Sequence, residues 1–150
     1  MTGDVLHMLV ALDLDQHGEV VLTEALHYAY RMNAIVDILH IAPPEPSDFV
    51  NYAAGPESVR DSVAKQLRER HHTVIGLREK AEQAGVTVGH TLTIQGEIPD
   101  SIIAEARRLR PDVLVMGQSH HRRFLQSLVR SPAEKTVEDV ECVVMIIPTS

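Results

Sequence analysis

Residues 113–117 are Val-Leu-Val-Met-Gly, an apolar run that ends in a glycine and is followed, after a basic loop, by the start of a helix. Ser131 is a suitable N-cap for that helix, Pro132 suits its first turn, and Glu134 completes a capping box. In an α/β protein this order places a helix N-terminus at the carboxyl end of a parallel strand, where ligands usually bind. The free amides of such a helix attract anions, and phosphates above all. The stretch therefore predicts both the class of fold and the edge of the sheet that holds a site.

The same alternation of apolar strands and amphipathic helices extends through the whole chain. Each short apolar run is bounded by polar, glycine or proline residues, and apolar residues recur at helical spacing between the runs. Strands joined by helical crossovers must be parallel, with right-handed connections. We therefore predict a single α/β domain over residues 1–150. Its predicted strands are 8–12, 34–41, 86–94, 112–116 and 142–147, and its helices are predicted to begin near residues 16, 58, 99 and 131.

Several positions predict where these elements begin and end. Asp15 is a candidate N-cap for the first helix, and Gly85 is a candidate C-cap for the long second helix. The prolines in segment 42–46 end the second strand, because proline cannot continue a ladder of hydrogen bonds. Strand 86–94 alternates only partly between apolar and polar residues, which predicts a position near an edge of the sheet.

Composition excludes several classes of protein. The formal net charge of −7 argues against general nucleic-acid binding, which draws its affinity from a basic surface. The single cysteine, Cys142, cannot form a disulfide within the chain, and its place beside an apolar run predicts a small core residue in a buried strand. No apolar run is long enough to cross a membrane, and the N-terminus lacks the pattern of a signal peptide. We therefore expect a cytoplasmic protein that binds neither nucleic acid nor a membrane.

No group of residues has the spacing of an established catalytic or metal site. The chain lacks the G-x-S-x-G nucleophile elbow, the G-x-x-x-x-G-K-[ST] phosphate loop and the G-x-G-x-x-G fingerprint. The histidine pairs 71–72 and 120–121 have no further ligand at metal-binding spacing. We therefore predict no catalytic residue and no metal site.

Four segments resemble the sequences of universal stress proteins. They are the opening strand 9–13, the segment 96–99 before the third helix, the strand 112–117 and the terminal strand 142–148. The resemblance covers nearly the whole chain, and the order and lengths of the elements agree. It implies a three-layer α/β sandwich of the adenine nucleotide alpha hydrolase-like type. In such a fold a five-stranded parallel sheet, in the order 3-2-1-4-5, has helices on both faces.

Many members of that family bind ATP through a G-x2-G-x9-G-[ST] motif, and part of this motif is present. Gly117 matches the first glycine, and Ser131 matches the final Ser/Thr position. His120 and Arg130 stand where the second and third glycines are expected, and Pro132 has no N–H to offer a phosphate. Glycines in such loops allow positive φ angles and bring backbone amides close to phosphate oxygens. Their replacement therefore changes how a phosphate can be held.

Two interpretations of this basic loop remain open. In the first, the side chains of Arg122, Arg123 and Arg130 hold the phosphates in place of backbone amides, assisted by protonated His120 or His121. In the second, the loop is a solvated basic segment on an acidic protein and binds no nucleotide.

The resemblance is closer on the adenine side of the site. Asp13 occupies the position of the aspartate that family members direct at the nucleotide, and Ile41 and Met116 match apolar positions around the base. Asp13 has a second interpretation, because an aspartate at the end of a strand often caps the following turn. The candidate binding residues are Asp13, Ile41, Met116, Gly117, His120, Arg130 and Ser131.

These features predict a regulatory or stress-response protein that binds ATP or another adenine nucleotide at a degenerate site, without turnover. Any metal is expected only as magnesium carried by the nucleotide. The resemblance also implies a homodimer through the terminal strand, Cys142 to Ile147, which is apolar enough to pair with another chain. Two alternatives remain open: a dimeric scaffold that acts without a nucleotide, and a slow nucleotide hydrolase.

Overall fold

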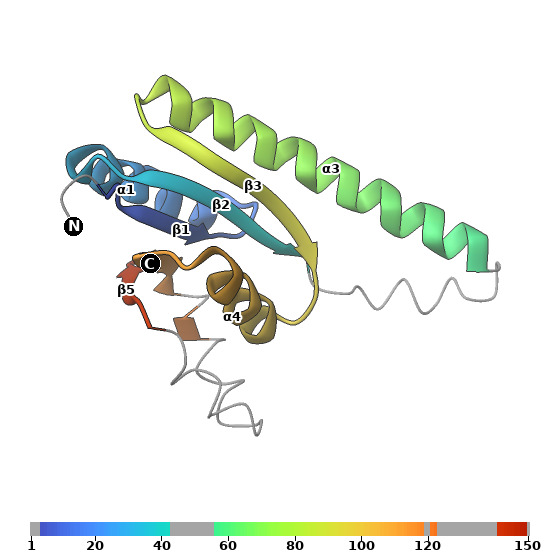
Figure 1. Ribbon diagram of the computed structural model, residues 1–150. Coiled ribbons are helices and arrows are strands. Elements are labelled where there is room, and N and C mark those ends of the chain that lie inside the picture. Colours follow the sequence, from blue (N-terminus) through green and yellow to red (C-terminus); the bar gives the residue numbers. More distant parts are fainter. Residues whose placement is uncertain (1–3, 43–55, 119–120, 123–140, 150) are drawn as a thin grey trace.

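The computed structural model describes residues 4–42, 56–118, 121–122 and 141–149 (Figure 1). In this part of the chain, strands and helices alternate as the sequence predicts. The predicted helix from Ser131 lies outside the described residues. The elements are β1 (His7–Ala11), α1 (Gln16–Met32), β2 (Ile35–Ala42), α3 (Pro56–Gln83), β3 (Thr87–Gln95), α4 (Ile98–Leu109), β4 (Val113–Gly117) and β5 (Val143–Ile147).

The five strands are all parallel and form one sheet in the order β3-β2-β1-β4-β5. This confirms the order that the resemblance implies. The central strand β1 pairs with β2 on one side and with β4 on the other, so that Ala11 lies opposite both Leu39 and Met116. The strand order reverses between β1 and β4, and ligands of open α/β sheets bind at the carboxyl ends of strands beside such a reversal.

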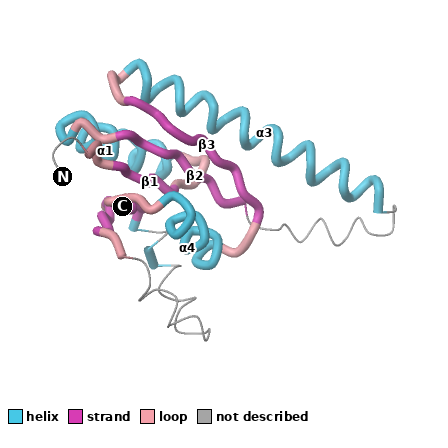
Figure 2. The backbone as a smooth tube through the Cα atoms, viewed as in Figure 1, coloured by secondary structure: helices cyan, strands magenta, loops and turns pink. Residues whose placement is uncertain are grey.

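Helices cover both faces of the sheet, which gives the fold three layers (Figure 2). On one face, α1 and α3 pack through a cluster that includes Leu22 and Val74. On the other face, α4 packs through a second cluster that includes Ile102. Successive residues of β1 serve the two clusters in turn, with Val10 in the first and Leu9 in the second, as the two-residue period of a strand requires.

The signals for helix ends at Asp15 and Gly85 are confirmed. The Gly18 N–H donates to Oδ1 of Asp15 at 2.9 Å, so Asp15 is the N-cap of α1. Gly85 has a φ of +82°, the left-handed conformation that commonly follows a helix, and it lies just beyond α3. The helix α3 begins at Pro56, before the predicted start at Ser58, because proline is favoured in the first turn of a helix.

The edge position predicted for the third strand is also confirmed, and β3 pairs with β2 with a register shift between Val36 and Ile38. The buried side chain of Asp37 lies at this shift. Its Oδ1 accepts a hydrogen bond from the backbone N–H of His90 at 2.6 Å and lies 3.2 Å from Nδ1 of the same residue. A Cβ at Gly89 would lie 2.5 Å from that oxygen, so the glycine makes room for the carboxylate.

The terminal strand β5 forms the opposite edge of the sheet, and the expectation that it is buried is wrong at its beginning. Val143 and Val144 are 64% and 46% exposed, and no described strand lies beyond β5. Cys142 precedes the strand, is partly buried and packs against the cluster beneath α4. The cysteine therefore belongs to the margin of the core, while the first valines of the strand face outward.

Candidate functional site

The carboxyl ends of β1, β2 and β4 bring four of the predicted site residues to one edge of the sheet. Ala11 lies opposite Met116, and Asp13 follows Ala11 by two positions. Gly117 is the last residue of β4, and Ile41 lies one residue before the end of β2. These four residues, Asp13, Ile41, Met116 and Gly117, therefore lie at or beside the reversal of strand order between β1 and β4.

Ile41 and Met116 supply apolar surface on the face of the sheet that α4 covers. Each is 1% exposed and belongs to the cluster that contains Leu39 and Ile102. Neither side chain is open to solvent, so a planar base can contact them only where a neighbouring group moves aside.

Asp13 lies just beyond β1, where its side chain is half-buried. Because Asp15 already caps α1, the helix has its N-cap without Asp13, and the capping interpretation of Asp13 is not needed for α1. The Asp13 residue lines two small depressions, one towards Gly117 and one towards α3. Its position at the junction of β1, β4 and α3 fits a residue that contacts a ligand at this edge.

Two glycines bring α1 close to the strand ends. A Cβ on Gly117 would lie 2.8 Å from Cγ2 of Val21 and 3.2 Å from Cγ2 of Thr149. A Cβ on Gly18, in the first turn of α1, would overlap the backbone carbonyl oxygen of Asp13. Close packing of α1 thus explains both glycines, and the described glycine with a positive φ is Gly85 instead. Sequence reasoning missed Gly18, although a glycine inside a predicted helix is a signal of close approach.

His40 is the second residue that sequence reasoning missed. It is 1% exposed, and its Nδ1 lies 3.0 Å from the carbonyl oxygen of Leu12, the residue before Asp13. Its Nε2 lies 3.0 Å from Nη1 of Arg70 on α3. A guanidinium can only donate, so Nε2 accepts, and Nδ1 carries the proton that is donated to Leu12. A histidine within an apolar strand run was the available signal, but its partners are distant in sequence.

Acidic residues gather at this edge on the side that faces α3. Carboxylates of Asp13, Asp15 and Glu19 line a crevice of about 90 Å³ between the start of α1 and the α3 residues Thr73 and Leu77. This concentration of negative charge disfavours a phosphate in the crevice. Within the described residues, no group of three or more His, Cys, Asp or Glu residues could hold a metal ion.

The remaining predicted residues, His120, Arg130 and Ser131, lie outside the described residues. Of the basic loop, the described part contains His121 and the exposed Arg122. The structure therefore describes Asp13, Ile41, Met116 and Gly117 of the predicted site, whereas the motif positions His120, Arg130 and Ser131 rest on the sequence alone.

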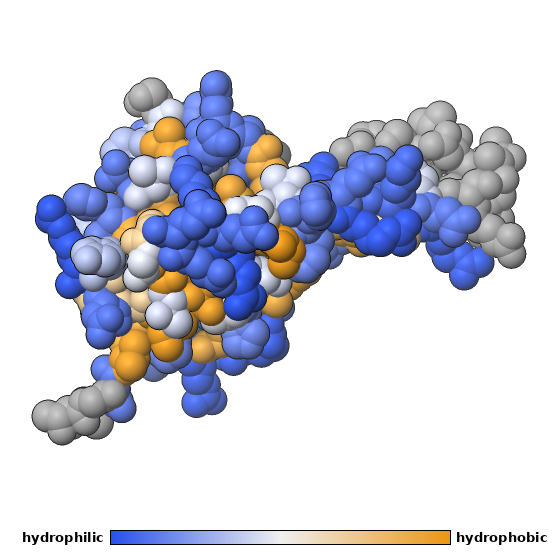
Figure 3. Space-filling model, turned by 90° about the horizontal axis from the view of Figure 1, so that it is seen from above, coloured by the Kyte–Doolittle hydropathy of each residue, from blue (hydrophilic) through white to orange (hydrophobic). Residues whose placement is uncertain are grey.

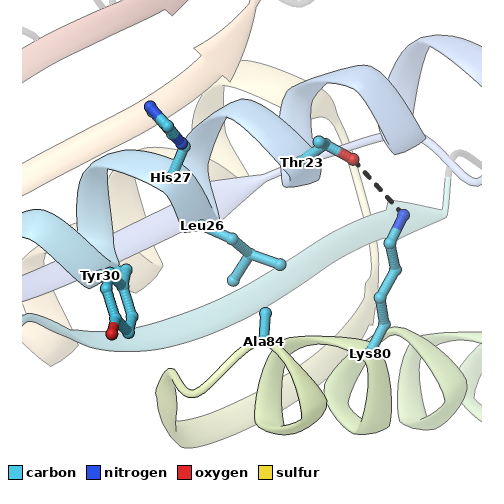
Figure 4. Close-up of a pocket in the computed structure, with 6 residues that line it drawn as sticks. All are labelled: Thr23, Leu26, His27, Tyr30, Lys80 and Ala84. Atoms are coloured by element: carbon cyan, nitrogen blue, oxygen red, sulfur yellow. Dashed lines mark hydrogen bonds between the residues drawn. The ribbon is translucent and has the colours of Figure 1, made fainter.

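A separate depression lies between α1 and the end of α3 (Figure 4). Its volume is about 340 Å³, and Nζ of Lys80 lies 3.4 Å from Oγ1 of Thr23 at its rim. None of the predicted site residues lines it. The lining residues are Thr23, Leu26, His27, Tyr30, Lys80 and Ala84.

Cys142 is a free thiol at the margin of the core. Burial raises the pKa of this thiol above its ordinary value, and a backbone hydrogen bond involving Leu114 opposes the shift. A raised pKa lowers the fraction of reactive thiolate at neutral pH. The thiol of Cys142 is therefore not a candidate reactive group of the site.

Comparison with known proteins agrees with this arrangement. The chain matches the model of the Universal stress protein family over residues 5–148. Universal stress protein A of Escherichia coli (strain K12) is 26% identical over 146 residues, which cover 95% of this chain and 93% of that protein.

Two solved structures have a similar fold. The universal stress protein from Archaeoglobus fulgidus in complex with dAMP has a TM-score of 0.60 at 17% identity, over 95% of this chain and 97% of that one. A universal stress protein family protein from Arabidopsis thaliana with AMP bound has a TM-score of 0.57 at 20% identity, over 97% of this chain and 92% of that one.

Within the described residues, no helix has the length and apolar character needed to cross a membrane.

Proposed function

The chain belongs to the universal stress protein family, and from this membership we propose that it is a regulatory protein that binds an adenine nucleotide at the carboxyl ends of β1 and β4. The observation that carries the proposal is the convergence of Asp13, Ile41, Met116 and Gly117 at this edge. The similar structures from Archaeoglobus fulgidus and Arabidopsis thaliana, which hold dAMP and AMP, support adenine as the base.

The chemistry of the proposed complex follows from these side chains. The base contacts Ile41 and Met116 once their covering neighbours move, and the Asp13 carboxylate accepts a hydrogen bond from the exocyclic amine or from a ribose hydroxyl. The phosphates extend past Gly117 towards His120, Arg130 and Ser131, away from the acidic crevice between α1 and α3. Magnesium enters only as the counterion of the phosphates.

The proposed mechanism is binding without turnover. Occupancy by ATP would change the surface beside Gly117 that a partner meets. A slow nucleotide hydrolase is the alternative in which the same site carries out chemistry. Release of ADP or AMP during prolonged incubation with ATP would favour that alternative.

We also propose that the functional unit is a homodimer formed through β5. Val143 and Val144 stand exposed at the edge of the sheet, and an apolar edge strand gains both hydrogen bonds and burial when it pairs with a second copy. In the scaffold alternative this dimer forms and acts without a nucleotide.

Isothermal titration calorimetry with ATP, ADP, AMP and GTP tests the nucleotide proposal. We expect heat of binding for the adenine nucleotides and little for GTP. Asp13→Asn should weaken binding about tenfold, because a hydrogen bond to a charged group contributes about 1.5 kcal/mol or more. Asp100→Asn, on the exposed first turn of α4, is the matched control. Absence of both heat and thermal shift at millimolar nucleotide would sink the proposal.

The two interpretations of the basic loop are separated by Arg130→Ala. If arginine side chains hold the phosphates, this variant lowers the affinity for ATP more than the affinity for adenosine. Equal affinities in the variant and the parent protein reject that role for Arg130.

A further inference from the structure

We propose that the groove between α3 and the edge strand β3 binds an extended acidic segment of a partner protein by strand addition. The groove has a volume of about 580 Å³. It lies beside β3, at the edge of the sheet farthest from β5. Figure 3 shows the hydrophilic arm of α3 reaching out from the body of the protein, with hydrophobic residues at their junction.

The backbone of β3 is available for pairing on its outer side. In the described part of the chain β3 pairs with β2 alone. Its segment from Thr91 to Gln95 keeps a regular register with β2, whereas the irregularity lies earlier, opposite Val36 and Ile38. Natural edge strands are commonly protected by lysine, proline or a bulge. Thr87–Gln95 contains neither lysine nor proline, so its regular half remains a suitable template for another strand.

The helix α3 forms the second wall of the groove. His71 Nδ1 lies 2.9 Å from Oγ1 of Thr93, and this contact joins the helix to the strand at the groove. Leu67 and Ile75 of α3 provide apolar lining. A helix that lies beside an open edge strand forms the kind of groove in which domains bind extended peptides by strand addition.

The charge of the groove selects an acidic occupant. Arg68 and His72 both line it and are exposed, and no described residue forms an ion pair or hydrogen bond with either. Residues 65–72 contain three Lys or Arg residues, two histidines and one glutamate, although the whole chain has a formal charge of −7. This local excess of positive charge complements carboxylates on a partner.

These features specify the partner segment. Side chains of an added strand point alternately to its two faces. Every second side chain would point towards α3, where apolar groups would contact Leu67 and Ile75 and carboxylates would lie within reach of Arg68 and His72. The expected occupant is therefore an extended segment that carries both acidic and apolar residues on the face directed at α3. This inference is independent of nucleotide binding, because the groove contains none of the proposed nucleotide-binding residues.

Fluorescence anisotropy with a labelled ten-residue peptide tests the proposal; its odd positions carry Glu and Val in turn, and its even positions carry Thr. The comparison peptide has the same number of glutamates but has two valines replaced by proline, which prevents strand pairing. We expect saturable binding of the first peptide only, weakened by added salt. Hydrogen exchange should show protection of amides in residues 91–95 when the peptide binds.

Matched charge reversals on α3 locate the binding site. Arg68→Glu should weaken peptide binding about fivefold or more, because it removes one favourable charge pair and adds a repulsive one. Arg78→Glu makes the same change outside the groove, at a residue that is paired with Glu82, and should have a much smaller effect. Both variants should keep the circular dichroism spectrum and nucleotide affinity of the parent protein.

Three outcomes would overturn the proposal. Equal binding of the proline-containing peptide would show plain electrostatic attraction without strand addition. Equal weakening by Arg68→Glu and Arg78→Glu would show a diffuse charge effect. Self-association that protects residues 91–95 without any peptide would show that β3 pairs with a second copy of this chain instead.

Discussion

The guanidinium of Arg70 lies against the buried imidazole of His40, with Nη1 3.0 Å from Nε2. The other ring nitrogen of His40 donates to the carbonyl oxygen of Leu12 at 3.0 Å. This pair therefore connects α3 to the carboxyl end of β1, immediately before Asp13. The backbone just before Asp13, the proposed ligand-binding residue, is thus held by polar contacts that link the end of β1 to β2 and α3.

Replacing His40 by phenylalanine should destabilise the protein. His40→Phe keeps a ring of similar size but removes both hydrogen-bonding nitrogens, so the Leu12 carbonyl and Arg70 each lose a partner. Leaving the carbonyl of the buried Leu12 without this hydrogen bond costs about 1–3 kcal/mol of the free energy of unfolding. Urea denaturation followed by circular dichroism measures this change. His72→Phe, at an exposed position on α3, should change the free energy by less than about 0.5 kcal/mol, and equal losses in the two variants would contradict the assigned role of His40.

Two glycine-to-alanine substitutions in helices should have opposite effects. In Gly18→Ala the new methyl group would overlap the carbonyl of Asp13, so the start of α1 must shift, at a cost of about 1–3 kcal/mol. In Gly76→Ala the methyl group meets nothing within 4 Å, and the higher helix propensity of alanine should stabilise α3 by about 0.5–1 kcal/mol. Thermal and urea denaturation measure both. Tolerance of alanine at position 18 would mean that α1 does not pack as closely on Asp13 as described.

The raised pKa of Cys142 predicts a particular dependence on pH. At neutral pH the folded protein should react with iodoacetamide more slowly than the urea-unfolded protein, because less of the folded thiol is ionised. The difference in reaction rate between the folded and the unfolded protein should narrow as the pH rises through the raised pKa of Cys142. Simple steric protection would give a difference that does not depend on pH. Since burial favours the neutral thiol, its contribution to stability is fully present below the ordinary thiol pKa and is lost as the pH rises through the raised pKa. In Cys142→Ser, the free energy of unfolding measured over the same pH range should not show this loss of stability.

Charge at the exposed edge of β5 should prevent dimer formation. Val144→Lys places an ammonium group on the strand that is proposed to pair with a second copy, and edge lysines oppose such pairing. Val20→Lys makes the same change on α1, where the valine is 44% exposed compared with 46% for Val144. Sedimentation velocity should show a monomer for the first variant and a dimer for the second. A dimer that persists in Val144→Lys would place the interface elsewhere.

The limits of sequence-based prediction are clear in the strands. Each predicted strand lies within one residue of the observed one, because apolar runs bounded by glycine, proline and polar residues are local signals. Strand order is not local, since it depends on which way each crossover turns, and here it came only from the family resemblance. For the same reason the sequence did not predict the contact between His40 and Arg70, which are 30 residues apart and meet only when α3 packs on the sheet. Asp13 was predicted from the family resemblance, and Gly117 from the apolar run that it ends, a local signal that places it at the carboxyl edge of the sheet.

The strand order also determines how many partners an assembled protein could hold. Because β3 and β5 occupy opposite edges of one sheet, a dimer that consumes the β5 edges leaves both β3 edges open, one at each far end. Such an assembly is bivalent. A partner with two acidic segments, joined by a linker long enough to span the dimer, would bind its second segment at high effective concentration, with avidity well above the affinity of either groove alone.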